Sequence, residues 1–416
     1  MKTFILLFHF FCFLSFASAS FLKWEELAEL PAPDGLDENI GVAGPFVGVH
    51  NDALIVAGGA NFPDKPLWET DKVWHDRIYV LSKQSDGNYV WQNGGKLDKP
   101  IAYGSSVSTS NGVLCIGGDD SKKVYTDVFM LSWNAKDKKL SKKEMPSLPE
   151  PVAYGSAAIH NDTVYLVAGQ SGKKLGTATN KIWTLNLSEA ENGEWKTLPE
   201  VPWKSRAFLQ VATQHNGYDD CIYVIGGRQQ DGDRVNFFSD VWEYNLNTKE
   251  WQERKRSPSP IMAGTAIGFS QSHVAVLGGA DGSLWGKEDD LRDNHPGFPK
   301  KTFLYHTITN TWIEAGESPA NHVTTVPVEW NNSLIIATGE IRPRVRSATI
   351  WKVTPTPIQK GFGLINYIVL IVYLLIMVGI GFYFAGRNKG TDDFFRGGKR
   401  MVWWAAGCSI FATMLS

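Results

Sequence analysis

The chain has 416 residues, of which 43% are apolar and 20% are charged, as is usual for a globular protein. Its formal net charge of −2 provides no basic surface of the kind that nucleic-acid-binding proteins need, so we exclude nucleic acid as a partner. Sixteen tryptophans and forty glycines favour many short strands joined by tight turns over a helical fold.

The first 19 residues, MKTFILLFHFFCFLSFASA, have the pattern of a cleaved signal peptide. Lys2 provides a positive start, residues 3–16 form an apolar stretch, and Ala17-Ser18-Ala19 is a small-residue cleavage site. The alternative is an uncleaved anchor helix, for which this stretch is short. We therefore expect the mature chain to begin near Ser20 and to leave the cytoplasm.

An apolar strand that ends in glycine recurs six times in the following part of the chain. The strands are LIVAGG, LCIGG, YLVAG, YVIGG, VAVLGG and LIIATG, which end at Gly59, Gly118, Gly169, Gly227, Gly279 and Gly339. A polar loop and a further strand follow each of them, and most units then carry a tryptophan: Trp91, Trp195, Trp251 and Trp312, with Leu140 in the second unit. These four-stranded units resemble kelch repeats, which implies an all-β fold, a six-bladed β-propeller over residues 20–354.

The sixth unit reaches ATIWKV without an outermost strand, because the chain then continues toward a different kind of segment. The segment WEELAELP near the start resembles WKTLPEVP, an outer strand of the third unit. We expect residues 21–30 to complete the sixth blade, so that both ends of the propeller pair and no strand edge stays exposed.

A proline-containing linker at residues 355–360 precedes an uncharged apolar stretch, residues 361–386, which is long enough to cross about 30 Å of hydrocarbon. Positive residues follow it closely: Arg387, Lys389, Arg396, Lys399 and Arg400. Because positive charge favours the cytoplasmic side, the sequence predicts a single transmembrane helix with the propeller outside the cytoplasmic membrane.

Residues 387–416 contain DFFRGGKR and WWAAGCS, which resemble the opening of the sodium:solute symporter family. The resemblance implies a truncated symporter-like segment that leads into a second membrane helix. A transporter needs many more helices, so this chain is not expected to transport a solute by itself.

Two cysteines of the propeller, Cys115 and Cys221, lie in apolar strands and are expected to be buried free thiols. Histidines at repeat-equivalent turns are expected to be structural: His50, His160, His215 and His273. No spacing predicts a metal site, a copper radical centre or a phosphate-binding loop, and we expect no cofactor.

The residue after each repeat glycine is expected at an equivalent position on one face, around the central axis. These residues are Ala60, Asp119, Gln170, Arg228, Ala280 and Glu340. Acid, amide and arginine around a funnel suit a polar, anionic small molecule. Asp119, Gln170 and Arg228 are therefore candidate substrate-binding residues, the alternative being that they are solvated loop residues.

Glu340 is followed by arginines at every second position, Arg342, Arg344 and Arg346. If the loop reverses tightly, the side chains of Glu340 and Arg346 converge near the axis. The alternative is an exposed ion pair, which contributes little to stability.

Residues 21–353 resemble the sialic acid mutarotase (N-acetylneuraminate epimerase) family, and more narrowly its cyclically permuted branch. The resemblance rests on GVAGPFVGVHNDALIVAGGANFPD, KPIAYGSSVS, NDTVYLVAG, MAGTAIGF, AGESP and ATGEIRPRVRS. In that family, Gly-Glu followed six residues later by Arg carries the proposed catalytic pair, which implies Glu340 and Arg346 here. Arg344 and Arg228 would then assist in binding the substrate.

The implied function is interconversion of the α and β anomers of N-acetylneuraminate, which supplies sialic acid for uptake. A carboxylate can transfer the protons, and an arginine can hold the sugar's carboxylate. A membrane and a sodium-coupled sialic acid transporter are the implied partners. The alternative is a non-catalytic sugar-acid capture module of such a transporter, and the signal peptide argues against an intracellular scaffold.

Overall fold

The computed structural model describes residues 21–189, 193–199, 201–356 and 363–385. The chain divides into two compact units, residues 1–356 and residues 357–416, which we describe separately. The predicted signal peptide and the symporter-like segment lie outside the described residues.

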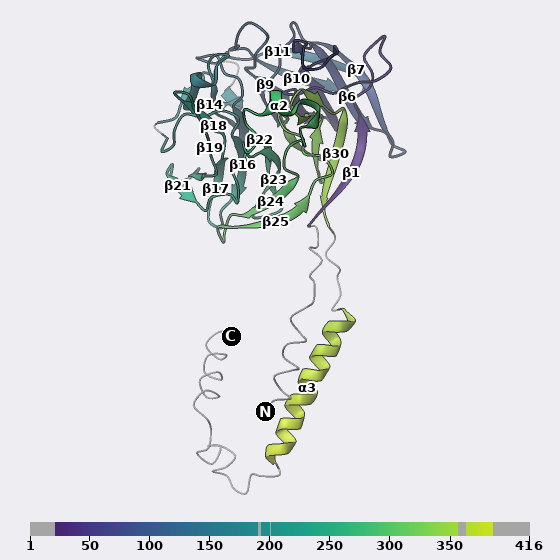
Figure 1. Cartoon of the computed structure of the whole chain (residues 1–416), viewed down its shortest axis with the longest axis vertical. Helices are drawn as coiled ribbons and strands as arrows, with labels where there is room; N and C mark the ends of the chain where they lie inside the picture. The colour runs from purple at the N-terminus through teal and green to yellow at the C-terminus, as the bar shows by residue number, and fades with distance from the viewer. Residues whose placement is uncertain (1–20, 190–192, 200, 357–362, 386–416) are drawn as a thin grey trace. The chain divides into compact units, whose positions relative to one another are not determined.

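The described residues between Phe21 and Thr356 form a six-bladed β-propeller, as predicted, with six four-stranded antiparallel sheets around a central axis (Figure 1). The first sheet consists of β2 (Phe46–His50), β3 (Ala53–Ala57), β6 (Arg77–Lys83) and β7 (Tyr89–Lys96). The second consists of β8 (Ser105–Thr109), β9 (Gly112–Ile116), β10 (Val128–Asn134) and β11 (Lys139–Glu144). The third consists of β12 (Ser156–His160), β13 (Thr163–Gln170), β14 (Ala178–Asn186) and β15 (Lys196–Thr197).

The remaining three sheets repeat this arrangement. The fourth consists of β16 (Gln210–His215), β17 (Asp220–Ile225), β20 (Val241–Asn245) and β21 (Trp251–Arg254). The fifth consists of β22 (Met262–Phe269), β23 (His273–Ala280), β24 (Lys301–His306) and β25 (Thr311–Glu317). The sixth consists of β26 (Pro327–Trp330), β27 (Ser333–Ala337), β30 (Thr349–Pro355) and β1 (Leu22–Glu29).

The sixth sheet draws its outer strand from the start of the chain, as the sequence predicts. β1 pairs antiparallel with β30, from Leu22 opposite Pro355 to Glu29 opposite Thr349, and the two strands lie side by side in Figure 1. Leu22 is 3% exposed and packs in the core between the fifth and sixth sheets. The pairing closes the ring and covers the edge of β30.

The central part of the second strand of each sheet is apolar because both of its faces are buried. In β9, Val113 and Cys115 pack toward the first sheet, whereas Leu114 and Ile116 pack toward the third. Six such apolar clusters lie between neighbouring sheets around the ring. Cys115 and Cys221 are free and buried in these clusters, as predicted.

A closed ring of six backbone hydrogen bonds surrounds the axis where the inner strands begin. The N–H groups of Tyr103, Tyr154, Phe208, Ala263, Thr324 and Gly44 each donate to the carbonyl of the preceding member, over 2.6–2.8 Å. All six residues have left-handed backbones, with φ between 52° and 65°. Such a conformation costs roughly 1–2 kcal/mol for a residue other than glycine, so the ring hydrogen bonds have to compensate it.

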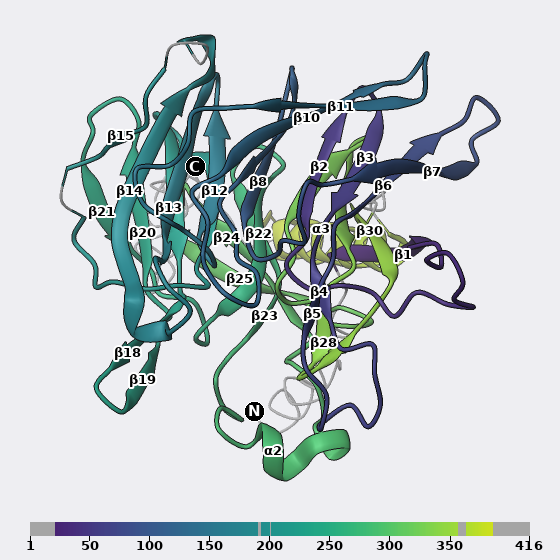
Figure 2. The same ribbon diagram turned by 90° about the horizontal axis from the view of Figure 1, so that it is seen from above.

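The loops that follow the repeat glycines gather on one face of the propeller (Figure 2). Three of them form short ribbons: β4 (Ala60–Asn61) with β5 (Val73–Trp74), β18 (Arg228–Asp231) with β19 (Arg234–Phe237), and β28 (Glu340–Arg342) with β29 (Val345–Arg346). Short helical turns are η2 (Leu175–Thr177), η3 (Leu187–Glu189), α2 (Glu288–Leu291) and η4 (Arg292–Asn294).

The described part of the second unit is one helix, α3 (Leu364–Ala385), within the predicted stretch 361–386. Residues Leu364–Tyr383 have a mean hydropathy of 2.5 and are long and apolar enough to cross a membrane.

A buried histidine makes the stability of the propeller sensitive to acid. His322 is 2% exposed, and its ring lies edge-on to that of Trp351 with ring centres 6.5 Å apart. Burial lowers the pKa of His322 from its ordinary value of 6.5 to about 4. As the pH falls, the imidazole of His322 is therefore protonated in the unfolded chain before it is protonated in the folded one. The contribution of neutral His322 to the free energy of unfolding is complete above pH 6.5 and is lost toward pH 4.

We expect His322→Leu to reduce the fall in melting temperature between pH 7.5 and pH 4.5, because the variant has no imidazole to protonate. The measurement is thermal unfolding of the full chain in detergent, followed by tryptophan fluorescence. His160→Leu, at a repeat-equivalent turn, is the control and should keep the wild-type pH dependence. An unchanged fall in both variants would contradict this origin of the acid sensitivity.

Candidate functional site

The residues after the repeat glycines occupy equivalent positions around the axis. Each pairs in an antiparallel bridge with the residue just before a member of the hydrogen-bonded ring. The pairs are Ala60 with Ala43, Asp119 with Ala102, Gln170 with Ala153, Arg228 with Ala207, Ala280 with Met262, and Glu340 with Val323. This repeated register brings side chains distant in sequence to one face of the propeller.

The Glu340 and Arg346 side chains meet. The two residues lie opposite each other in the β28–β29 ribbon, and Arg346 Nη1 is 2.9 Å from Glu340 Oε1. The reversal between the strands includes Arg344, whose φ is 66° and whose backbone N–H donates to the same Oε1 over 3.0 Å. Within the described residues Oε2 of Glu340 accepts no hydrogen bond, and the side chain is 18% exposed. One carboxylate oxygen is therefore held and the other is available.

The guanidinium of Arg346 is occupied by the protein itself. Its side chain is 2% exposed, Nε donates to the carbonyl of Ala60, and the Tyr103 hydroxyl is a further partner. Burial acts to lower the pKa of Arg346, but Glu340 and Tyr103 together, through charge and hydrogen bonds, raise it overall. Arg346 therefore orients Glu340 through a charged hydrogen bond.

Arg344 braces a neighbouring blade. Its Nη1 donates to the carbonyls of Leu67 and Thr70, and its guanidinium lies over the rings of Phe62 and Trp68. These contacts join the loop of the sixth blade to that of the first.

A segment of the fifth blade, residues 281–299, reaches toward the same site. Arg342 donates to the backbone carbonyl and the carboxylate of Asp293, and Trp68 Nε1 lies 3.4 Å from that carboxylate. The segment carries His295, which is 6% exposed and whose Nδ1 accepts the N–H of Gly297. Burial lowers the pKa of His295, while the charges of Glu288 and Glu340 act in the opposite direction.

Asp119 and Gln170 also point into the protein. Asp119 is fully buried and accepts hydrogen bonds from Trp74 Nε1 at 3.0 Å, from the Tyr154 hydroxyl at 2.8 Å, and from Lys173. Gln170 is 3% exposed and its Nε2 donates to the carbonyl of Gly172 over 3.2 Å. Asp119 therefore organises the side chains around it.

Arg228 differs from these residues because the part of the chain that the structure describes gives it no anionic partner. Its guanidinium lies 4.2 Å from the ring centre of Phe208 and 4.3 Å from that of Trp285. Burial lowers its pKa to about 10.

The sequence reasoning missed an aromatic floor beneath these side chains. Tyr103 and Tyr154 stack with ring centres 4.8 Å apart, and Tyr154 and Phe208 stack at 4.6 Å. All three belong to the hydrogen-bonded ring. Burial, reinforced by Asp119, raises the pKa of Tyr154 well above its ordinary value, so its hydroxyl stays a donor. The recurrence of AYGS in the second and third units could have revealed the two tyrosines.

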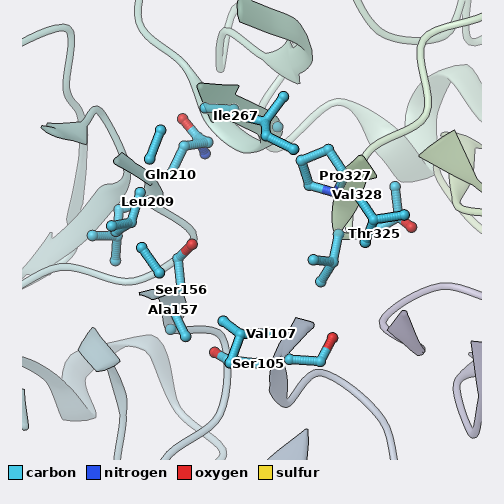
Figure 3. Close-up of a pocket in the computed structure, with 18 of the residues that line it drawn as sticks. Ser105, Val107, Ser156, Ala157, Leu209, Gln210, Ile267, Thr325, Pro327 and Val328 are labelled. Atoms are coloured by element: carbon cyan, nitrogen blue, oxygen red, sulfur yellow. The ribbon is translucent and has the colours of Figure 1, made fainter. Parts of the chain in front are cut away.

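A cavity lies along the axis, between the inner strands (Figure 3). It measures about 370 Å³, and Figure 3 shows Ser105, Ser156 and Gln210 among its lining side chains. Glu329 is its only lining carboxylate among the described residues, and no arginine lines it there. We therefore assign the acid–base chemistry to the loop face.

Comparison with known proteins identifies the family. The sequence pattern of N-acetylneuraminate epimerase matches residues 14–140 and 145–295, more than half of the chain. The chain belongs to the N-acetylneuraminate epimerase family.

Curated relatives in this family share modest identity with the chain. The N-acetylneuraminate epimerase of Haemophilus influenzae is 38% identical over 130 residues, which are 29% of this chain and 33% of that protein. The N-acetylneuraminate epimerase of Salmonella enteritidis is 27% identical over 231 residues, 50% of this chain and 57% of that protein. The chain thus spans between about a third and somewhat over half of the length of these relatives.

A solved structure has the same fold as this chain. The structure of YjhT superposes with a TM-score of 0.59 at 17% identity, covering 80% of this chain and 98% of that one. Its likeness concerns the propeller fold alone.

The Glu340–Arg346 pair leads to a stability prediction. Arg346→Gln leaves the carboxylate of Glu340 without its charged partner, which should lower the free energy of unfolding by about 3 kcal/mol. Arg342→Gln is the matched control, because that side chain is 30% exposed in its pair with Asp293 and should cost less than about 1 kcal/mol. Urea unfolding of the full chain in detergent measures both. Equal small effects would show that the buried pair does not stabilise the loop.

Proposed function

We propose that this protein is a mutarotase that interconverts the α and β anomers of N-acetylneuraminate. The observation that carries the proposal is the Glu340 carboxylate, with Oε1 held by Arg346 and Oε2 available. Membership of the N-acetylneuraminate epimerase family supports the choice of substrate.

The reaction needs two proton transfers and one reversible bond cleavage. Glu340 Oε2 removes the proton of the anomeric hydroxyl, the bond between the anomeric carbon and the ring oxygen breaks, and its electron pair stays on the ring oxygen. That oxygen takes up a proton, either the one that Glu340 holds or one delivered through water. Rotation about the bond between the new carbonyl carbon and the next carbon of the sugar chain exposes the other face of the carbonyl. The reverse steps then form the other anomer, with no net change in atoms or electrons.

Arg346 acts through Glu340 in this scheme. The carboxylate faces Arg346 across the ribbon, so its free oxygen is directed by a buried charged hydrogen bond. A general base has to lie within hydrogen-bonding reach of the proton it takes, and orientation is what Arg346 contributes.

The proposed mutarotase function predicts that anomer exchange depends on Glu340. Glu340→Gln keeps the shape of the side chain but removes the base, so exchange should slow by roughly 10²- to 10⁴-fold. The measurement is NMR exchange of N-acetylneuraminate near neutral pH, with the full chain in detergent. Glu329→Gln, in the axial cavity, is the control and should keep the wild-type rate.

The same experiment tests the alternative of a non-catalytic capture module, which needs the residues around the funnel and the arginines but not Glu340. Binding of the sugar acid without exchange above the spontaneous rate would favour that module and reject the mutarotase.

We further propose that the chain is exported and held in the cytoplasmic membrane by α3, where it supplies sialic acid for uptake by a sodium-coupled transporter. Support comes from the signal-like start, the apolar span Leu364–Tyr383 and the positive residues after it. The assignment to a cyclically permuted branch, joined to a sodium:solute symporter-like segment, belongs to this proposal.

The proposed topology can be tested with a tag at the C-terminus of the full chain, expressed in a bacterium. Protease added to intact spheroplasts should remove the propeller and leave the tag protected, because the propeller faces outward. A cytoplasmic marker protein is the control for lysis. Digestion of the tag with preservation of the propeller would reverse the proposed orientation.

A further inference from the structure

Arg228 is a largely buried arginine for which the described residues provide no carboxylate. Arg206 pairs with Asp240 at 2.6 Å, and Arg254 pairs with Glu243 at 2.6 Å. Arg346 pairs with Glu340. For Arg228, by contrast, Nε is buried and has no partner among the described residues, and Nη1 contacts the sulfur of Met262 at 3.9 Å.

Two aromatic rings hold the guanidinium of Arg228 in place. The guanidinium carbon lies 4.2 Å from the ring centre of Phe208 and 4.3 Å from the ring centre of Trp285. Phe237, on the strand paired with that of Arg228, lies edge-on to Trp285 with ring centres 5.7 Å apart. Stacking fixes a guanidinium plane but leaves its N–H groups at the edge without acceptors.

An unpaired guanidinium in such surroundings is costly to keep, since burial disfavours its charge. The cost is recovered when an anion binds, because a carboxylate accepts two parallel hydrogen bonds from the guanidinium edge. The lowered pKa, about 10, still leaves Arg228 charged near neutral pH.

Arg228 belongs to the same site as Glu340. Both residues follow a repeat glycine and occupy equivalent positions in the ring of bridges, two blades apart. The carboxylates of Glu288 and Glu340 both reach Arg228 electrostatically and act to raise its pKa. An anionic ligand bound to Arg228 would therefore lie on the face that carries the candidate base.

We propose that Arg228, packed against Phe208 and Trp285, is the receptor for the carboxylate of the sugar acid and makes the site selective for anionic over neutral sugars. Arg346 does not take this role, because its donors are engaged by Glu340, Ala60 and Tyr103. The proposal rests on the proposed function for the identity of the sugar acid, but binding can be measured without turnover.

The test compares two ligands that differ in one charge, N-acetylneuraminate and its neutral methyl ester. Isothermal titration calorimetry with the full chain in detergent measures the affinity for each. The wild type should bind the acid at least about 10-fold more tightly than the ester. Arg228→Met should weaken binding of the acid by about 10- to 100-fold and change binding of the ester by less than about 3-fold.

Arg234→Met, an exposed arginine on the paired strand β19, is the matched control and should leave both affinities unchanged. The wild-type comparison does not depend on whether the Arg228 variant folds. Equal affinity of the wild type for acid and ester would overturn the proposal. An equal loss of affinity for both ligands in Arg228→Met would also overturn it, because that result indicates a structural role.

The outcome separates this inference from the proposed function. If Arg228→Met loses acid-selective binding while the wild type catalyses no anomer exchange, the receptor stands and the mutarotase fails. If exchange depends on Glu340 while Arg228→Met binds the acid normally, the mutarotase stands and the receptor fails.

Discussion

The closed ring of six backbone hydrogen bonds is the constraint on which the rest of the propeller depends. Each bond joins the start of one inner strand to the start of the next, from Gly44 around to Thr324. The left-handed backbones that the ring requires place Tyr103, Tyr154 and Phe208 in a stack. Because the residues after the repeat glycines pair with the segments that lead into this ring, they converge on the same face. The ring thus connects closure of the fold with construction of the site.

The arginines of the site are of two kinds. Three of them bind groups of the protein itself, and one has no anionic partner among the described residues. Arg346, Arg344 and Arg342 each donate to another blade or to Glu340, so they hold the loops together. Arg228 lies against two aromatic rings without an anion in the described part of the chain. An ion pair formed within the protein favours structure, whereas an unpaired cation favours an external anion, because burial of the lone charge is otherwise uncompensated.

Several features of the site could be predicted from the sequence and others could not. The six-residue spacing between Glu340 and Arg346 indicated a pair, and the structure joins them across a two-stranded ribbon. Asp119 and Gln170 were predicted as substrate-binding candidates, and both turn inward to partners in their own surroundings. Their direction depends on Tyr154 and Gly172, and no pattern in the strand itself contains that information. The contribution of residues 281–299 was also unforeseen, because an irregular loop has no periodicity from which to read its path.

What the sequence determined by itself is the part that repeats. Continuous apolar strands ending in glycine specify strands buried on both faces, six repeats specify six blades, and the matching segment at residues 21–30 specifies how the ring closes. What only the tertiary structure decided is which side chain meets which. The aromatic floor, the engaged guanidinium of Arg346 and the unpaired one of Arg228 depend on contacts between residues up to 286 positions apart. Local propensity and burial act along the chain and leave a pattern in it, whereas a hydrogen bond between distant blades exists only once the ring has closed.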